Sequence, residues 1–417
     1  MKLLMLSLMI NSFLISACGT NALTKRTIHS EIVKLAQQNN FSGSLLIAFN
    51  DSVIVNYARG YLNSNKKEEI TTETPIAIAS ITKLFVKHSI FLLEEQGKLS
   101  LNDKLSKFRS DIQYSDSITI SDLIFHSSGL PDIHNEIAMF NDPWSLNKQV
   151  NTEDLFSLIK SLNYIHFKPG TNSRYSNSNY LILADIIESI SGMSLDIFLD
   201  KNIFTPYGMK STGLYKEHSS IPGHAQGFYR HNNETVWLPD FNFKNFWGTG
   251  NAYSTPYDLY KYMINVKNGL NPKYSKQLIQ HTGYYLGYRT LLKSIPELGI
   301  TIVVLSNNGN FNPDIILNSA LNYIVEEISK NVIKSSCTSF TGKYSAERFH
   351  RKIEIVVTEK EGNLFVNNMH ALQVSQNVFL LLQNGYVTLT FSTMPNNSIS
   401  IEMNDNGNIF IFEKSKL

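Results

Sequence analysis

The chain has 417 residues, 42% of them hydrophobic, and a formal net charge of +2. A charge so close to balance, with no basic patch, argues against a nucleic-acid partner. The length suits one large domain and a smaller one.

A short apolar segment, residues 3–14, follows Lys2. A membrane-spanning helix needs about 20 residues, so this segment is typical of a secretory signal instead. Residues 14–18 resemble a bacterial lipobox, which predicts that cleavage leaves Cys18 as a lipidated N-terminus. The alternative is an ordinary cleaved signal with an incidental cysteine. We expect residues 1–18 to be a lipoprotein signal peptide that anchors the protein to a membrane of the bacterial cell envelope, on the extracytoplasmic side.

Hydrophobic periodicity then predicts a mixed fold over residues 19–334. Terminal helices are expected to pack on one face of an antiparallel sheet, with a helical region on the other side. The predicted elements are a helix at 27–39, a hairpin of strands at 43–49 and 53–60, a mainly helical region at 80–202, strands at 283–292 and 299–306, and a helix at 313–330.

Ser80 and Lys83 form a Ser-x-x-Lys motif. The small apolar residues 75–79 precede it, and an apolar helix that continues to Gly97 follows it. This context places Ser80 at a buried helix N-terminus, with Lys83 one turn later on the same face. A serine hydroxyl needs a base, and a desolvated lysine can act as one. The plain alternative is an N-cap serine with a surface lysine. The same spacing to a lysine also occurs at Ser64, Ser145 and Ser157.

Two later motifs add candidate site residues. Tyr175-Ser176-Asn177 supplies a phenol and an amide, and His281-Thr282-Gly283 supplies a cation-capable ring and a glycine that lets a strand edge approach a substrate. Taken alone, the first could be a loop with a helix cap and the second a turn at a strand end.

In this order the three motifs resemble those of the serine β-lactamase and D-alanyl-D-alanine peptidase superfamily, specifically its class C branch. Residues 126–131 are similar to the family's H-T-S-G-L-P turn, residues 250–259 to its G-G-x-x-S-T-x-x-D-L stretch, and residues 300–307 to the strand after the third motif. The resemblance covers about residues 30–330. It implies an α/β (α+β) fold with an antiparallel sheet flanked by helices and an all-helical region.

The resemblance also implies catalytic roles. Ser80 is the expected nucleophile, Tyr175 passes the proton, and Lys83 polarises both hydroxyls. The developing oxyanion needs preorganised donors, and the Ser80 N–H at the helix start is one of them. The resemblance implies that the N–H of Tyr284 is the other.

Substrate binding is expected at Asn177, His281, Thr282, Gly283 and Tyr284. By resemblance, Asn177 holds the substrate amide, while Thr282 and His281 face the carboxylate of a D-alanine-ended peptide or a β-lactam. No cofactor and no metal are expected.

The expected function is a serine hydrolase that acts through an acyl-enzyme and binds penicillin. The favoured activity is that of a D-alanyl-D-alanine carboxypeptidase-like enzyme or a D-alanyl ester or peptide hydrolase. His281 stands where dedicated class C β-lactamases usually carry lysine, which weakens the case for fast drug hydrolysis. Three alternatives remain open: a class C-type β-lactamase, a small-ester esterase, and a non-catalytic penicillin-binding sensor.

Residues 237–247 are unusually aromatic. One interpretation is a loop anchored in the core. The other is a hydrophobic wall beside Ser80 for the acyl side chain.

The pattern changes in residues 335–417, where short strands alternate with Gly and Asn. This spacing predicts a small β-barrel or sandwich. Residues 340–344 resemble the opening of the lipocalin-like module that follows some members of the family. Six strands are expected, at 353–358, 364–367, 378–382, 387–391, 399–403 and 409–412.

Overall fold

The computed structural model describes residues 22–137, 150–215, 221, 223–232, 234–239, 242–331, 338–349, 351–381, 387–395, 398–405 and 408–415. The predicted signal peptide, Cys18 and the motif at Ser145 lie outside these ranges. Within them, no helix has both the length and the apolar character needed to cross a bilayer.

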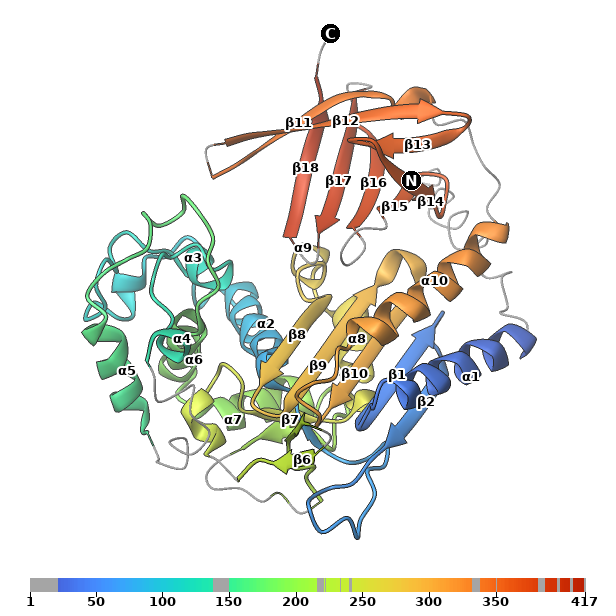
Figure 1. Ribbon diagram of the computed structural model, residues 1–417. Coiled ribbons are helices and arrows are strands. Elements are labelled where there is room, and N and C mark those ends of the chain that lie inside the picture. Colours follow the sequence, from blue (N-terminus) through green and yellow to red (C-terminus); the bar gives the residue numbers. More distant parts are fainter. Residues whose placement is uncertain are drawn as a thin grey trace.

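A five-stranded antiparallel sheet, in the order β2-β1-β10-β9-β8, forms the centre of the large domain (Figure 1). Leu45 and Ile47 of β1 face the core beneath the terminal helices, whereas Leu46 and Ala48 pack against Tyr260 on the opposite face. Successive side chains of a strand point to opposite faces, so a strand covered on both sides is apolar throughout. The strands are β1 (Gly43–Phe49), β2 (Ser52–Arg59), β8 (Gln280–Tyr285), β9 (Tyr288–Ile295) and β10 (Ile300–Ser306).

Helices cover both faces of this sheet. The terminal helices α1 (Ala22–Gln38) and α10 (Asp314–Asn331) share one core with it, and the helical region packs on the other side. α2 packs against α6, so that Ser80 and Tyr175, which lie just before these two helices, come to the same edge. The remaining α-helices complete the helical side: α2 (Thr82–Glu95), α3 (Ile120–Ile124), α4 (Ile133–Glu136), α5 (Thr152–Ser161), α6 (Asn177–Ser191), α7 (Leu195–Leu199), α8 (Pro256–Gly269) and α9 (Pro272–Ser275).

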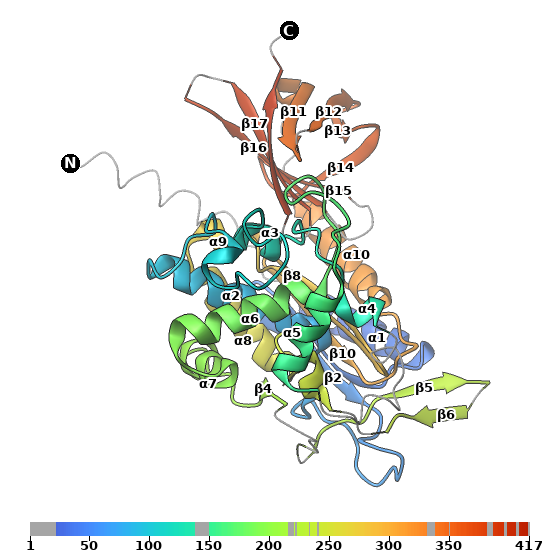
Figure 2. The same cartoon turned by 90° about the vertical axis from the view of Figure 1, so that its left-hand side faces the viewer.

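Two small sheets lie at the far end of the large domain from the C-terminal strands (Figures 1 and 2). One sheet joins β3 (Ile76–Ala77), β7 (Ala252–Ser254) and β4 (Gly213–Leu214). The other is a hairpin of β5 (Phe228–His231) and β6 (Glu234–Trp237).

The C-terminal strands form a closed barrel in which each strand pairs with the next and β18 returns to β11. The barrel has eight strands where the sequence predicted six. The sequence did not predict β11 and β14, because most of their side chains are exposed or half-buried and show no clear apolar alternation. Tyr344 and Ala371 are the buried residues of these two strands. The strands are β11 (Gly342–Arg348), β12 (Arg351–Lys360), β13 (Asn363–Val366), β14 (Met369–Gln373), β15 (Val378–Leu381), β16 (Val387–Thr393), β17 (Ile399–Asp405) and β18 (Asn408–Lys414).

The barrel is docked on the large domain. Val374 and Leu380 join the apolar core that the sheet shares with α1 and α10. Lys276 donates to Glu402 at 2.5 Å across the interface. The predicted fold class is therefore confirmed, including a barrel after the sheet-and-helix domain. The predicted boundary at residues 334 and 335 falls outside the described residues and stays a prediction.

Candidate active site

Ser80 lies in a 3₁₀ turn, Ala79–Ile81, that leads directly into α2. Ala79 adopts a left-handed conformation with φ of 48°, which is unfavourable for a residue with a Cβ. Two hydrogen bonds hold the turn: Thr82 Oγ1 donates to the Ala79 carbonyl at 2.7 Å and accepts from the Ala252 N–H at 3.1 Å. These hydrogen bonds hold Ser80 in place although the backbone at Ala79 is strained.

Lys83 is completely buried next to this serine. Its Nζ lies 3.2 Å from Ser80 Oγ and donates to the Thr249 carbonyl at 2.5 Å. Burial lowers the pKa of Lys83 to about 7, although the negative charge of Asp132 opposes the shift. A large fraction of the amine is therefore neutral near pH 7 and can accept a proton from the serine.

The Tyr175 hydroxyl donates to Ser80 Oγ at 2.9 Å. Its ring stacks on His126, with the ring centres 4.5 Å apart. The residue is 41% exposed, yet the protein around the hydroxyl raises the pKa of Tyr175 by desolvation. The phenol therefore stays protonated at neutral pH, and Lys83 is the better base of the two.

Asn177 and Asp132 form a buried pair beside the nucleophile. The Asn177 amide donates to both carboxylate oxygens of Asp132, at 3.1 and 3.0 Å. Asp132 is 3% exposed, and desolvation raises its pKa. The sequence reasoning missed Asp132, although it directly follows the 126–131 turn. Asn177 is held by this carboxylate, and its predicted contact with a substrate amide stays a prediction.

Gly283 on β8 lies against the turn that carries Ser80. A Cβ at this glycine would sit 2.5 Å from the Ile78 carbonyl oxygen and 2.9 Å from the Ala79 Cβ. The sequence predicted that this glycine gives room to a substrate. The structure shows a further reason for the glycine, which is the close passage of β8 past the turn that carries Ser80, and the predicted approach to a substrate stays a prediction.

His281 approaches Tyr175 from the other wall, with the ring centres 6.5 Å apart. Burial, aided by the charge of Lys83, lowers the pKa of His281 to about 3. Its Nδ1 lies 2.6 Å from the Thr282 carbonyl oxygen, a contact that needs the proton on Nδ1. The low pKa favours the neutral ring at pH 7, and the predicted contact of His281 with a substrate carboxylate stays a prediction.

Thr282 and Tyr284 point outward from the edge strand β8. Tyr284 is 62% exposed, and the Arg289 guanidinium lies 3.4 Å from its ring centre. The role of the Tyr284 N–H as an oxyanion donor stays a prediction.

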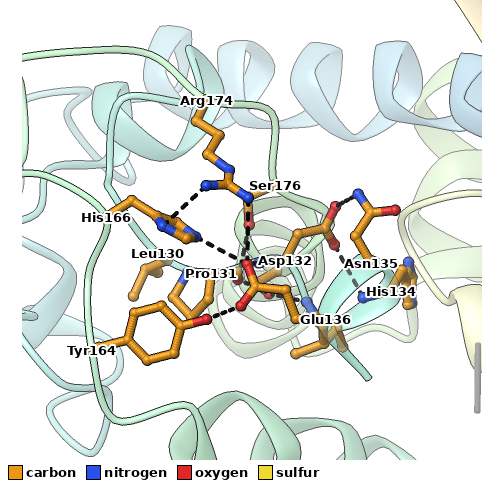
Figure 3. Close-up of polar contacts among 12 residues, drawn as sticks. Leu130, Pro131, Asp132, His134, Asn135, Glu136, Tyr164, His166, Arg174 and Ser176 are labelled. Carbon is orange, nitrogen blue, oxygen red and sulfur yellow. Dashed lines mark hydrogen bonds and ion pairs between the residues drawn. The ribbon is translucent and has the colours of Figure 1, made fainter. Parts of the chain in front are cut away.

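A polar network next to the Tyr175 loop was not expected from the sequence (Figure 3). The Glu136 carboxylate contacts His166 Nε2 at 2.9 Å and accepts a short hydrogen bond from the Tyr164 hydroxyl. Arg174 Nη1 contacts His166 Nδ1 at 3.1 Å. The Asp132 N–H donates to Glu136 at 3.4 Å. These four residues, Glu136, Tyr164, His166 and Arg174, form a positioning network that ties the residue before Tyr175 to the segment carrying Asp132.

The remaining motifs lie elsewhere. Ser64 is exposed in a turn, and Ser157 is exposed on α5. In the aromatic segment, Phe243 and Phe246 are buried, and Phe243 stacks on Tyr215 with the ring centres 4.0 Å apart. The core-anchored interpretation is thus confirmed for these residues. Among the described residues, no group of three or more His, Cys, Asp and Glu side chains could hold a metal ion.

Comparison with known proteins places this geometry in a family. Residues 28–274 match the family model described as Beta-lactamase. The chain is 27% identical to penicillin-binding protein 4* of Bacillus subtilis (strain 168), covering 66% of this chain and 69% of that protein. It is 30% identical to protein flp of Staphylococcus aureus (strain NCTC 8325 / PS 47), covering 66% of this chain and 61% of that protein.

Solved structures agree on the fold. The D-amino acid amidase from Ochrobactrum anthropi SV3, complexed with L-phenylalanine amide, has a TM-score of 0.64 at 20% identity, covering 74% of this chain and 99% of that chain. The octameric penicillin-binding protein homologue from Pyrococcus abyssi has a TM-score of 0.62 at 20% identity, covering 93% of this chain and 99% of that chain. The chain therefore belongs to the β-lactamase family of serine hydrolases, within the serine β-lactamase and DD-peptidase superfamily.

Proposed function

We propose that the protein hydrolyses D-alanyl peptides or D-alanyl esters through an acyl-enzyme on Ser80, and that penicillin acylates the same serine. One observation carries the proposal: Lys83 Nζ and the Tyr175 hydroxyl converge on Ser80 Oγ at 3.2 and 2.9 Å. A nucleophile with a base and a proton donor in reach is the arrangement that acyl transfer requires.

The reaction proceeds in two halves. Neutral Lys83 takes the proton of Ser80, and Oγ attacks the substrate carbonyl, whose oxyanion is held by the N–H groups of Ser80 and Tyr284. The C–N or C–O bond then breaks. Tyr175 protonates the leaving group and recovers a proton from Lys83. In the second half, a water molecule gives a proton to Lys83 or Tyr175 and attacks the ester carbon of the acyl-enzyme. The ester bond breaks, and the same groups return a proton to Ser80 Oγ.

The substrate class is supported by two lines of argument. Several relatives carry the name penicillin-binding protein, and one structural neighbour is a D-amino acid amidase. His281 is neutral in the free protein, so the site lacks the fixed positive charge that a lysine would supply there. The nearest alternative, a β-lactamase, is favoured by the description of the matching family model.

The proposed location is the outer surface of a bacterial membrane. It is supported by the signal-like residues 2–17 and by Cys18 at the end of a lipobox-like segment. A Cys18→Ser variant should lose palmitate labelling, and unchanged labelling would rule out the anchor.

Intact-protein mass spectrometry tests the proposed activity. Penicillin should add one drug mass, located at Ser80 after digestion and lost slowly, with a burst and then a low steady rate of nitrocefin hydrolysis. A D-alanine-ended peptide or a D-alanyl thioester should turn over faster. Fast nitrocefin hydrolysis without a burst, together with no cleavage of D-alanyl substrates, would favour the β-lactamase.

A further inference from the structure

A cavity of about 380 Å³ lies between the helical region and the barrel. The large domain contributes Phe125, Ser127 and Gln277 to its wall, and the barrel contributes Arg348, Phe349 and Phe410. Its volume lies in the range of pockets that hold drug-sized ligands. Because the barrel is docked by an apolar core and by the Lys276–Glu402 ion pair, both walls belong to one folded unit.

In the proposed reaction the leaving group departs on the side of the active site where Tyr175 lies. The group that protonates the leaving atom must lie next to it, and Tyr175 is that group in the proposed reaction. The Tyr175 ring rests on His126, whose two chain neighbours, Phe125 and Ser127, line the cavity. Gln277, which also lines it, comes shortly before β8 and His281 on the opposite wall. The cavity therefore adjoins the Tyr175 side of the active site, although Ser80, Lys83 and Tyr175 do not line it.

Arg348 lines this cavity on the barrel side. Its guanidinium lies 4.8 Å from the Phe349 ring centre and 4.7 Å from that of Phe410. Asp405 acts on it electrostatically, but within the described part of the chain no carboxylate forms an ion pair with it. A guanidinium held between two rings keeps its planar set of N–H donors available for an anion.

A buried lysine lies behind the opposite wall, and burial lowers the pKa of Lys87 to about 7, so it carries only part of a positive charge at neutral pH. Lys87 Nζ donates to the Gln277 carbonyl at 3.1 Å and is 5.0 Å from the Phe125 ring centre. Among the described residues it also lacks a carboxylate partner. Two carboxylates line the cavity, but Asp122 already accepts hydrogen bonds from Thr119 and Ser127, and Glu347 is exposed to solvent.

We propose that this interdomain cavity binds the far end of a leaving group that is longer than one D-alanine and that ends in an anion, a carboxylate or a phosphate, with Arg348 as its main contact. The inference rests on the proposed function, because it takes Tyr175 as the leaving-group acid. It assigns the barrel a part in substrate selection.

Three substrates with one N-acetyl-D-alanyl acyl group test the subsite. Their leaving groups are D-alanyl-diglycine with a free carboxylate, its neutral amide, and the same peptide ending in phosphoethanolamine. The better of the two anionic substrates should gain a charge-assisted hydrogen bond to the Arg348 guanidinium. Its kcat/KM should therefore be about tenfold higher than that of the amide, mostly because its KM is lower. The order of the carboxylate and phosphate substrates identifies the preferred anion.

Arg348→Gln should abolish this preference, whereas the matched control Arg351→Gln should keep it. Arg351 is exposed and pairs with Arg348 in the same hairpin. An Arg348→Gln variant that retains the full preference would overturn the proposal.

Two further measurements separate this inference from the proposed function. Acylation of Ser80 by penicillin reports whether each variant is folded and has an intact nucleophile. Calorimetric binding of D-alanyl-diglycine alone to Ser80→Ala, compared with its amide, tests the cavity without any catalysis. If the free peptide and its amide bind equally, the subsite is disproved even when acylation is normal. If Ser80 is never acylated but the charged peptide binds through Arg348, only the proposed function fails.

Discussion

The large domain and the barrel bury different kinds of side chain. Among the described residues, the large domain buries four charged side chains, Lys83, Asp132, Asp258 and Lys293, whereas the barrel buries none. The barrel core consists instead of aromatic and aliphatic residues such as Phe379, Phe391 and Phe412. Burying a charge is unfavourable unless it is paired, so such groups need another reason to be there. The proposed reaction at Ser80 accounts for the burial of Lys83 and Asp132. It does not require a buried charge in the barrel.

The largest expected effect is the loss of the nucleophile. Ser80→Ala should abolish covalent labelling by fluorescent penicillin or a fluorophosphonate, because removing the nucleophile of an interlocked site commonly lowers kcat by about 10⁶-fold. Gel fluorescence measures the label. Ser64→Ala is the matched control and should label normally, since Ser64 is exposed and far from the motif. Labelling that survives Ser80→Ala would refute the mechanism.

Lys83→Met should remove acylation almost as completely and should also change how stability depends on pH. The folded protein lowers the pKa of Lys83 to about 7, against about 10.4 in an unfolded chain. Between these values the unfolded chain binds more protons, so the wild type gains stability as the pH rises through this window. Lys83→Met should lack that gain. Urea unfolding of both proteins at pH 7 and pH 9.5 measures it, and equal gains would show that Lys83 is not desolvated.

The wild-type rate of Ser80 acylation should rise with pH through an inflection near 7, as Lys83 loses its proton. Stopped-flow acylation by nitrocefin over pH 5 to 9 reports this rate. A flat profile would assign the base to another group.

Tyr175→Phe keeps the stacked ring and deletes the hydroxyl. Loss of general acid help should lower turnover by about 10²–10⁴-fold while the substrate still binds. Steady-state kinetics with a D-alanyl peptide would show the drop in kcat. Wild-type turnover in this variant would make Tyr175 a structural residue.

A substitution in the barrel core should lower the stability of the protein without removing the acylation of Ser80. Phe391 is 1% exposed and stacks on Phe340 with the ring centres 4.4 Å apart, so Phe391→Ala should destabilise the protein by about 3–5 kcal/mol. Chemical denaturation measures the loss, and acylation of Ser80 by penicillin should continue in the protein that remains folded. A variant that is folded but not acylated would break the division between the two regions.

The smallest expected effect concerns the positioning network. His166 contacts Arg174 through Nδ1 and Glu136 through Nε2, so it links the residue before Tyr175 to the segment that carries Asp132. His166→Gln should lower kcat about tenfold with little change in KM, because the Tyr175 hydroxyl would be held less accurately over Ser80. Glu136→Gln, which keeps the shape of the carboxylate, should give a similar loss. Steady-state kinetics measures this split, and an unaltered kcat in both variants would limit the network to a structural role.

Much of this fold could be predicted from the sequence, because its signals are local. The hairpin of β1 and β2 follows from two apolar runs around Asn50 and Asp51, both of which adopt positive φ in the structure. The barrel strands β11 and β14 could not be predicted, because their polar residues become strands only through pairing with neighbours. The local pattern of such strands is too weak to identify them.

The sequence by itself identified the three side chains that meet at the proposed active site, Ser80, Lys83 and Tyr175, because their residue types and order suit the needs of acyl transfer. Tertiary structure alone decided their chemical states. The carbonyl that holds Lys83 comes from Thr249, 166 residues away, and the low pKa of His281 comes from burial and from the charge of Lys83, which lies far from it in the sequence. Asp132 and the Glu136 network also act through distant partners. A protonation state depends on solvent exclusion and on charges brought close in space, and neither is encoded in a local stretch of sequence.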